Sequence, residues 1–497
     1  MNTKLLVALL TAIGLSLALG VGKASAWLRD PDTMSTTAVL AQLVPPDATI
    51  GDSDTTAVGV GDEAVGADPQ AAPSDPPDSH TLFVDNTPTN GDCPATPYTM
   101  IQSAVDASGP GATIKVCPGT YPEQVRITGH MHDKLKLESL KPLKATIQWP
   151  TPETMPFVLV DIKTADHVRL TGFVVTGPFP ACGSEGERHE GVLVENASDA
   201  EIDRNHITQI RSVTPAGRGC QGGDAVAIGR RSDPQNTLTD LPASARVHDN
   251  VIDLQQKNGI QAVNNGTFVH ADHNTIVGPG LPAQPYAAPN GVVVFRQAAG
   301  HVDHNTISNN HFTGNTAVAQ GGGIILANTP SGSSKIDHNA IYNNDYGIET
   351  DTQTNMTIEH NDVYENAFDG IVLCGDATQN CGPASGLVVR DNKISYNGFN
   401  GGSGILMLNA DANLIKSNKI EHNGDPDGDT TDGLRVDSNS GNNEIDENQL
   451  DQNVHHDCHD DSNGTGSGTP PTANTWKNDS GDTQNRDGLC KGAATTT

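Results

Sequence analysis

Aromatic and apolar side chains are scarce in this chain of 497 residues. Phe, Trp and Tyr make up 4% of the sequence, and all hydrophobic residues together make up 35%. A large, close-packed globular core needs more apolar side chains than that. The 52 Gly and 31 Pro residues indicate a backbone that turns often. The composition therefore favours a thin, elongated core.

Positive charge is also in short supply. The chain has 29 Lys and Arg residues against 60 Asp and Glu residues, and its formal net charge is −31. Nucleic acid and anionic membranes are repelled by such a protein, so neither is expected as a partner. An acidic polysaccharide is also repelled on average, unless Ca²⁺ or a local arginine cluster intervenes.

Long apolar runs are confined to the first residues. Lys4 is followed by an apolar run from Leu5 to Gly22 and then by Ala24-Ser25-Ala26, which is the order of a secretory signal. We expect residues 1–26 to be a cleaved signal peptide and the protein to be secreted or extracytoplasmic. An uncleaved membrane anchor is the alternative, since the run is nearly long enough to span a bilayer. No later segment resembles a transmembrane helix, so no membrane insertion is expected after cleavage.

Composition divides the remaining chain into three segments. Residues 27–80 are rich in Asp, Pro, Ala, Thr and Gly without an apolar period, and we interpret them as a disordered linker. Short strands and turns repeat from residue 81 to about 455, which predicts one folded domain. Residues 456–497 are expected to form a C-terminal tail and cap, with Trp476 covering exposed core.

Eight cysteines follow the leader. An even number behind an export signal predicts disulfides in an oxidising compartment. Many connectivities are open to eight cysteines, but a stack of repeats favours pairing within one repeat or between neighbours. The expected pairs are Cys93–Cys117, Cys182–Cys220, Cys374–Cys381 and Cys458–Cys490.

The strongest signal is an Asn followed, two positions later, by an aliphatic residue. This Asn recurs at Asn205, Asn250, Asn274, Asn305, Asn339, Asn361, Asn392, Asn418 and Asn448. Intervals of 22 to 34 residues fit one coil each, and the first interval of 45 is expected to hold two coils, the extra one carrying a strand at 224–228. Asn side chains stacked at equivalent turns can hydrogen-bond along the axis as a ladder.

A Gly followed by an aliphatic strand recurs between these sites. It is found at Gly191, Gly259, Gly291, Gly323, Gly347, Gly370, Gly404 and Gly433. We expect this Gly to supply a turn with positive φ. Alternate residues of the strand that follows, such as Ile371 and Leu373, are expected to face the core, because strand side chains have a period of two.

The start of the domain has a separate pattern. A strand is expected at 81–84, a helix with the apolar stripe Ile101, Ala104 and Val105, and a strand at 112–116. The order IQSAVDA, GATIKV, PGTYPEQV resembles the entry to pectin-lyase-like β-helices, in which a short helix plugs the open end of the first coil. Such a plug covers apolar core and unpaired backbone groups.

The entry and the two recurrences resemble the right-handed parallel β-helix repeat proteins of the pectin-lyase-like superfamily, which includes pectate lyases and alginate epimerases. The resemblance covers about residues 80–455. It implies an all-β fold, a single-stranded right-handed parallel β-helix (solenoid) with a short N-terminal capping helix. A leucine-rich repeat solenoid is the structural alternative, but the leucine spacing that it requires is absent.

Enzymes that resemble this fold bind polysaccharide in a groove along one sheet. The groove floor should be formed by the outward residues of the strands after Gly. These are Leu193, Gln261, Val293, Ile325, Glu349, Val372, Leu406 and Arg435. At least half are aliphatic, whereas a sugar site usually needs aromatics and convergent polar groups. Inserted loops packed over this row are therefore the alternative.

Two charged groups are candidates for catalysis. The first joins Glu349 and Asp351 to Arg435 and Asp437, on strands expected to lie three coils apart. The second combines His189, Glu190, Asp224, Arg230 and Arg231 on adjacent coils. Lyases and epimerases of uronates need a base and a cation, and glycoside hydrolysis needs paired carboxylates. The candidate catalytic residues are His189, Asp224, Arg230, Glu349 and Arg435, with solvated surface charge as the alternative for each.

Two segments could bind a metal ion. Asp425, Asp427, Asp429 and Asp432 surround Gly428 in a turn whose carboxylates could hold Ca²⁺, although the EF-hand pattern is not met. An ordinary acidic turn is the alternative. His455, His456 and His459, with the Asp residues near them, could bind Zn²⁺ or Cu²⁺, and a polar tail is the alternative there.

Signature motifs of two related activities are missing. The pectin methylesterase motifs GTVDFIFG and LGRPW are absent, and Asp425-Pro426 is followed by Asp427 and not by the His of the epimerase motif DPH. We therefore expect a secreted β-helix protein that acts on or binds an extracellular polysaccharide or cell-surface glycan, with a lyase or epimerase of acidic glycans as the enzymatic version. The alternative is a non-catalytic surface or matrix protein that serves as a rod for adhesion.

Overall fold

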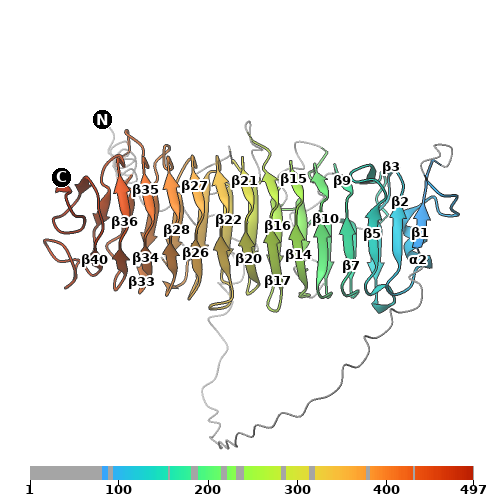
Figure 1. Cartoon of the computed structure of the whole chain (residues 1–497), viewed down its shortest axis with the longest axis horizontal. Helices are drawn as coiled ribbons and strands as arrows, with labels where there is room; N and C mark the ends of the chain where they lie inside the picture. Colours follow the sequence, from blue (N-terminus) through green and yellow to red (C-terminus); the bar gives the residue numbers. More distant parts are fainter. Residues whose placement is uncertain are drawn as a thin grey trace, which may run out of the picture. The chain divides into compact units, whose positions relative to one another are not determined.

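A computed structural model describes residues 81–87, 93–154, 157–180, 188–213, 221–230, 240–280, 287–312, 320–375, 381–428 and 431–495. These residues form a right-handed parallel β-helix whose coils follow one another in sequence order (Figure 1). The expected signal peptide, the linker and the Cys182–Cys220 pair lie outside them, as do Arg231 and Asp429. Among the described residues, the model has no helix with the length and hydrophobicity needed to cross a membrane.

A typical coil contributes one strand to each of three parallel sheets, here called A, B and C, and sheet B has fewer strands than the other two. Sheet A contains, in spatial order, β1 (Thr81–Val84), β2 (Thr113–Val116), β5 (Lys136–Ser139), β8 (Arg169–Thr171), β11 (Ala200–Asp203), β14 (Ser244–His248), β17 (Phe268–Asp272), β20 (Ala299–Asp303), β23 (Lys335–Asp337), β26 (Thr357–Glu359), β30 (Val388–Arg390), β34 (Leu414–Lys416), β37 (Glu444–Asp446) and β40 (Thr475–Lys477).

Sheet B follows the recurring Asn. It contains β3 (Gly119–Tyr121), β6 (Ala145–Gln148), β9 (Val174–Thr176), β12 (His206–Thr208), β15 (Val251–Asp253), β18 (Thr275–Val277), β21 (Thr306–Ser308), β24 (Ala340–Tyr342), β27 (Asp362–Tyr364), β31 (Lys393–Ser395), β35 (Lys419–Glu421) and β38 (Gln449–Asp451).

Sheet C includes the strands after the recurring Gly. It contains β4 (Val125–Thr128), β7 (Val158–Lys163), β10 (Glu190–Glu195), β13 (Asp224–Ile228), β16 (Asn258–Val263), β19 (Asn290–Phe295), β22 (Gly322–Ala327), β25 (Tyr346–Asp351), β28 (Ile371–Cys374), β32 (Ile405–Leu408), β36 (Leu434–Val436), β39 (Cys458–Asp460), β41 (Thr483–Gln484) and β42 (Ala494–Thr495). Outside the three sheets, β29 (Ala384–Ser385) pairs with β33 (Ala410–Asp411), and η2 (His130–His132) is a short 3-10 helix.

The core is a stack of aliphatic side chains enclosed by the three sheets. Ile371 and Leu373 are fully buried in it, as the period of two predicts. The helix α2 (Ile101–Ala107) buries Ile101, Ala104 and Val105 in the same core at its N-terminal end. The predicted fold class and capping helix are therefore confirmed.

The recurring Asn residues form a continuous ladder from Asn205 to Asn448. In a typical step, the backbone N–H and Nδ2 of Asn274 both donate to Oδ1 of Asn305, at 2.9 and 3.0 Å, and Nδ2 also donates to the carbonyl of Val247. Each amide is thus satisfied by groups of the coils on both sides, so no polar atom of the turn is left without a partner.

A second ladder runs parallel to the first and was not predicted. It links Asn310, Asn344, Asn366, Asn397, Asn423 and Asn453 through the same pairs of hydrogen bonds. Each member lies five positions after a member of the first ladder, at the turn between sheets B and C. The constant offset was readable in the sequence.

The recurring Gly residues have a different purpose from the one expected. None of the eight has a positive φ. Instead, a Cβ atom at Gly323 would lie 2.4 Å from Ile341 and 2.6 Å from the carbonyl oxygen of Gly347, so only Gly allows the next coil to approach. The positive φ falls on the residue before each Asn of the first ladder, such as His304 and His338 at 54° and 55°.

The 45-residue interval holds one coil, not two. Nδ2 of Asn205 donates directly to Oδ1 of Asn250 at 3.2 Å, so the two residues are neighbours in the ladder. The strand β13 is the sheet C strand of that same coil and lies between β10 and β16. The extra length is accounted for by the connections on either side of β13, which include residues outside the described ranges.

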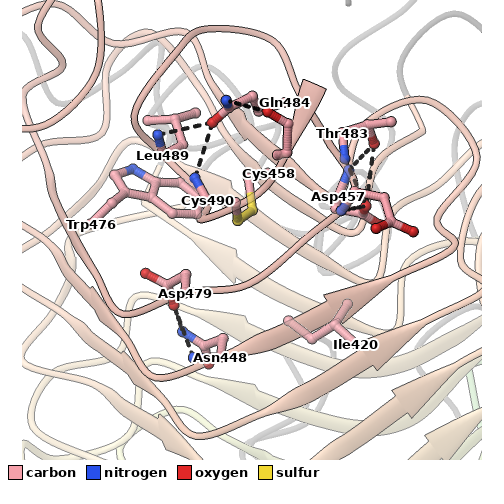
Figure 2. Close-up of a disulfide and its surroundings, with 12 residues drawn as sticks. Ile420, Asn448, Asp457, Cys458, Trp476, Asp479, Thr483, Gln484, Leu489 and Cys490 are labelled. Atoms are coloured by element: carbon pink, nitrogen blue, oxygen red, sulfur yellow. Dashed lines mark hydrogen bonds between the residues drawn. A yellow bond between two sulfur atoms is a disulfide. The ribbon is translucent and has the colours of Figure 1, made fainter. Parts of the chain in front are cut away.

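The stack continues beyond the expected boundary at residue 455. Strand β39 pairs with β36, and β40 pairs with β37, so the segment 456–497 adds strands to the helix in place of only folding over it. Trp476 stacks in register with Ile445 and is 5% exposed, which closes the core. Both Asn ladders end on carboxylates, because Asn448 donates to Asp479 and Asn453 donates to Asp457 (Figure 2).

Three of the four expected disulfides lie in the described residues, and all three are present. Cys93–Cys117, Cys374–Cys381 and Cys458–Cys490 have Cα–Cα distances of 6.1, 5.8 and 6.2 Å. The last one joins β39 to the C-terminal segment, where Oε1 of Gln484 accepts the backbone N–H groups of Leu489 and Cys490 (Figure 2). Disulfides of this kind are typical of proteins that fold in oxidising compartments.

Candidate functional site

The predicted groove floor exists as one column on the outer face of sheet C. Its members are register partners in consecutive strands: Leu193, Ala227, Gln261, Val293, Ile325, Glu349, Val372, Leu406, Arg435 and His459. From Leu193 to Val372 every member is at most 4% exposed, so most of this floor is covered. Leu406 and Arg435 are partly exposed, which places the accessible part near the C-terminal end of the sheet.

A second column of polar residues lies beside the first and was missed by the sequence analysis. It consists of residues immediately before the recurring Gly: Glu190, Asn258, Asn290, Tyr346, Asp369, Ser403 and Asp432. Hydrogen bonds connect its last members, because the Ser403 N–H donates to Asp369 Oδ1 at 2.6 Å and the Asp432 N–H donates to Ser403 Oγ at 3.2 Å. The dipeptides Glu-Gly, Asp-Gly and Asn-Gly within the repeat were the available signal.

The group predicted around His189 is split by its contacts. The His189 ring stacks on Phe179 at 4.1 Å, and burial lowers the pKa of His189 to about 4. Nε of Arg230 lies 2.9 Å from Oε2 of Glu195. The structure thus places His189 among aromatic rings and Arg230 in an ion pair. Their catalytic roles stay predictions.

Glu190 and Asp224 are brought together as register partners on β10 and β13. Burial raises the pKa of Asp224 to about 6, and burial followed by the charge of Asp224 raises the pKa of Glu190 well above its ordinary value. Oδ1 of Asp224 accepts two hydrogen bonds from Asn258, at 2.7 and 3.1 Å. Two buried carboxyls on neighbouring strands can share or exchange a proton.

Glu349 and Asp369 form a second pair of buried acids, on the coils of β25 and β28. Neither carboxyl oxygen of Glu349 has a hydrogen-bond partner, and the residue is fully buried. Burial, together with the charges of Asp351 and Asp369, raises the pKa of Glu349 well above its ordinary value. Burial also raises the pKa of Asp369 to about 7, against the opposing effects of backbone hydrogen bonds, from Ser403 first, and of the Arg435 charge. Asp369 is therefore able to gain and lose a proton near neutral pH.

Five charged residues gather at the C-terminal end of the same face, and we call them the histidine cluster: Asp432, Arg435, His456, His459 and Asp461. An Arg435 Nη donates to Asp432 Oδ2 at 2.8 Å, and the other donates to Asp461 Oδ2 at 3.2 Å. Burial alone would raise the pKa of Asp432, but His456, His459 and Arg435 outweigh it and hold that pKa well below its usual range. The distance between Glu349 and Arg435 spans the three coils that the sequence predicts.

The expected Ca²⁺ turn is only partly described. Asp425 Oδ1 accepts the backbone N–H of Asp427 at 2.9 Å, whereas both Asp432 oxygens face the cations of the histidine cluster. Asp432 therefore belongs to the sheet C face and not to the acidic turn. Because Asp429 lies outside the described residues, the Ca²⁺ site stays a prediction.

Comparisons with known proteins agree with the fold. A family model described as a right handed beta helix region matches residues 244–382. No curated protein matches the chain. Three solved structures are similar to it: a periplasmic alginate epimerase AlgG (15% identity, TM-score 0.42, 75% of this chain and 77% of that one), a Dettilon tailspike protein (17%, 0.48, 74% and 67%) and a lacto-N-biosidase from Eubacterium ramulus (11%, 0.45, 74% and 68%). At these identities the likeness extends to the fold alone.

Proposed function

We propose that this β-helix binds an extracellular polysaccharide on the outer face of sheet C, near the C-terminal end where Leu406 and Arg435 are partly exposed. Strands about 4.8 Å apart present equivalent side chains in a row, which suits a polymer with a repeating unit. Partly buried Phe368 and exposed Phe399 lie on neighbouring coils beside this region, where Asn400 donates to the carbonyl of Ala367. Aromatic rings of this kind can stack on sugars.

If the protein is an enzyme, we propose that it is a lyase or epimerase of an acidic polysaccharide. The observation that carries it is Asp369, which is 6% exposed, accepts the Ser403 N–H at 2.6 Å and has its pKa raised by burial to about 7. Asp369 would remove the proton α to a uronate carboxylate, and Arg435 would stabilise the negative charge that develops. Glu349 is fully enclosed, so it does not touch the sugar in this proposal.

A glycan-array screen of the full chain, followed by an assay for unsaturated uronide absorbance or for epimerised product, tests this proposal. We expect Asp369→Asn to abolish turnover with little loss of binding, and Arg435→Met to weaken binding of acidic glycans. Asp391→Asn is the matched control, because Asp391 is exposed on a turn between sheets A and B. If no acidic glycan binds the wild-type protein, or if Asp369→Asn turns over normally, the enzymatic proposal is wrong.

A non-catalytic rod is the second candidate, and the covered floor favours it. Gln261, Val293, Ile325 and Glu349 are at most 4% exposed, so the middle of sheet C offers little surface to a polymer. A protein used for adhesion would retain glycan or surface binding in both variants and would show no turnover of any polysaccharide.

A further inference from the structure

Three potential metal ligands converge at the end of sheet C. Asp432 comes two residues before β36, and His456 and His459 belong to the next coil, before and within β39. Nδ1 of His456 lies 2.9 Å from Oδ1 of Asp432, and Nδ1 of His459 lies 3.3 Å from Oδ2. The two Nδ1 atoms face each other at 3.2 Å. One potential ligand atom from each of these three side chains therefore lies within 4.8 Å of the other two.

The separation of the two imidazole nitrogens matches an edge of a tetrahedral metal site. With Zn–N and Zn–O bonds of about 2.0–2.1 Å, tetrahedral geometry places neighbouring ligand atoms about 3.3 Å apart. The two Nδ1 atoms are 3.2 Å apart, close to that value, and they approach different oxygens of Asp432, at 2.9 and 3.3 Å, so the carboxylate must turn to present one oxygen to both. A turn of that kind is within the reach of χ rotations.

The surroundings hold the ligands in the orientation that a metal needs. Nε2 of His459 lies 2.9 Å from Oδ1 of Asp461, so the ring presents Nδ1 to the cluster. A histidine that binds a metal usually directs its other ring nitrogen to a carboxylate or carbonyl in this way. Arg435 contacts both Asp432 and Asp461 and fixes the two carboxylates relative to each other.

The backbone of this region is also restrained. Arg435 and His459 are register partners on β36 and β39. Cys458, which lies between the two histidines in sequence, is bonded to Cys490, and Oδ2 of the neighbouring Asp457 accepts the Asp482 and Thr483 N–H groups (Figure 2). The ligand set is therefore preformed and does not depend on a flexible tail.

We propose that Asp432, His456 and His459 bind one Zn²⁺ ion, or a similar divalent transition metal, through two imidazole nitrogens and one carboxylate oxygen. This donor set suits Zn²⁺ better than Ca²⁺ or Mg²⁺, which prefer oxygen ligands throughout. Three protein ligands leave a fourth position for water or another oxygen ligand. The proposal is independent of the glycan proposal, because it concerns binding of the metal alone.

The test is a titration of the full chain, stripped with a chelator and dialysed, with Zn²⁺ and with Co²⁺. Calorimetry should show one tight Zn²⁺ site per chain, and the Co²⁺ form should show the strong visible absorption of a tetrahedral site. His456→Ala and His459→Ala should each weaken this binding about 100-fold. Two variants are controls: His455→Ala, next to the site, and His301→Ala, in the separate His270, His301 and Asp303 group on the surface.

Three results would contradict the zinc proposal. If the wild-type protein binds no Zn²⁺, if the Co²⁺ spectrum is that of an octahedral complex, or if His301→Ala removes the tight site, the assignment is wrong. Should His459→Ala fail to fold, the Co²⁺ spectrum of the wild type and the melting temperature of His456→Asn with and without Zn²⁺ still decide it. Zn²⁺ should raise the melting temperature of the wild type and leave that of His456→Asn unchanged.

Discussion

The asparagine ladders and the outer face of sheet C bury polar groups in the same coils by different means. A ladder residue such as Asn305 is neutral, and its amide is satisfied by the coils on both sides. The buried groups of the outer face are carboxyls whose pKa values shift in both directions, upward at Asp369 and downward at Asp432. The neutral Asn members of the ladders therefore contribute stability that pH does not change, whereas the face, like the Asp479 carboxyl that ends the first ladder, contributes stability that depends on pH.

Among the substitutions that test this contrast, Arg435→Met is expected to lower the free energy of unfolding the most. Removal of the guanidinium leaves the carboxylates of Asp432 and Asp461 with fewer cationic partners, and Asp432 is nearly fully buried. We expect a loss of about 3 kcal/mol in the free energy of unfolding at pH 7, measured by chemical denaturation with a chelator present. Arg390→Met is the control. The Arg390 side chain is half exposed, so this substitution should lower the free energy of unfolding by only about 0.5 kcal/mol. Equal losses would remove the distinction between buried and exposed ion pairs.

A smaller loss, about 2 kcal/mol, is expected from Asn339→Ala in the first ladder. The substitution takes away the Oδ1 atom that accepts the backbone N–H and Nδ2 of Asn305. Because no charge is involved, the loss should be the same at pH 5 and pH 8. Asn328→Ala, at an exposed position, is the control. A loss that changed strongly with pH would contradict the neutral role of the ladder.

Asp369→Asn should change the pH dependence of stability. Burial raises the pKa of Asp369 in the folded state from 3.8 to about 7, so this carboxyl lowers the stability progressively as the pH rises from about 4 to about 7. The variant should match the wild type at pH 4 and exceed it at pH 8 by on the order of 1–2 kcal/mol. Denaturation curves at the two pH values measure this. A variant that is less stable at pH 8 would show that the carboxylate is stabilised by contacts and not strained by burial.

The smallest effect is expected from Lys335→Met on the outer side of sheet A. Nζ of Lys335 contacts Glu359 at 2.7 Å and Asp337 at 3.3 Å, but the lysine side chain is 39% exposed. We expect a loss below about 1 kcal/mol that high salt abolishes. The comparison of denaturation midpoints at low and high salt measures it. A loss as large as that of Arg435→Met would mean that exposure does not separate the two faces.

Much of the fold could be predicted because it repeats. The first Asn ladder follows from the spacing between coils, the inward face of strands such as Ile371 to Leu373 follows from the alternation along a strand, and the three described disulfides follow from pairing within a coil or between neighbours. The repeat did not reveal why Gly323 is Gly, since the reason is the approach of Gly347 and Ile341 from the next coil. The prediction of two coils between Asn205 and Asn250 was wrong, because loop insertions lengthen the interval without adding a coil.

Less of the candidate site could be predicted, because its groups depart from the repeat. The alternation of side chains along a strand correctly predicted that Glu349 and Arg435 lie in one outward column of sheet C. It gave no indication that Glu349 is enclosed, since that depends on segments from other coils that pack over the sheet. The segment with His456 and His459 was interpreted as part of a tail, because the strand β39 is only three residues long and lacks the preceding Gly motif. Its place in the stack is set by pairing with β36, which sequence spacing does not encode.

The carboxylates that end the two ladders also determine what can follow the last coil. Every Asn passes an N–H donor to the coil after it, so a ladder that ended in Asn would offer a template on which another molecule could add. Oδ2 of Asp479 accepts the Lys477 N–H, and Oδ2 of Asp457 accepts the Asp482 and Thr483 N–H groups, so neither side chain has an amide donor to pass on, although the Asp457 N–H donates to Thr483 Oγ1. An acceptor-only side chain therefore ends each ladder, and sheet C continues beyond it through β41 and β42.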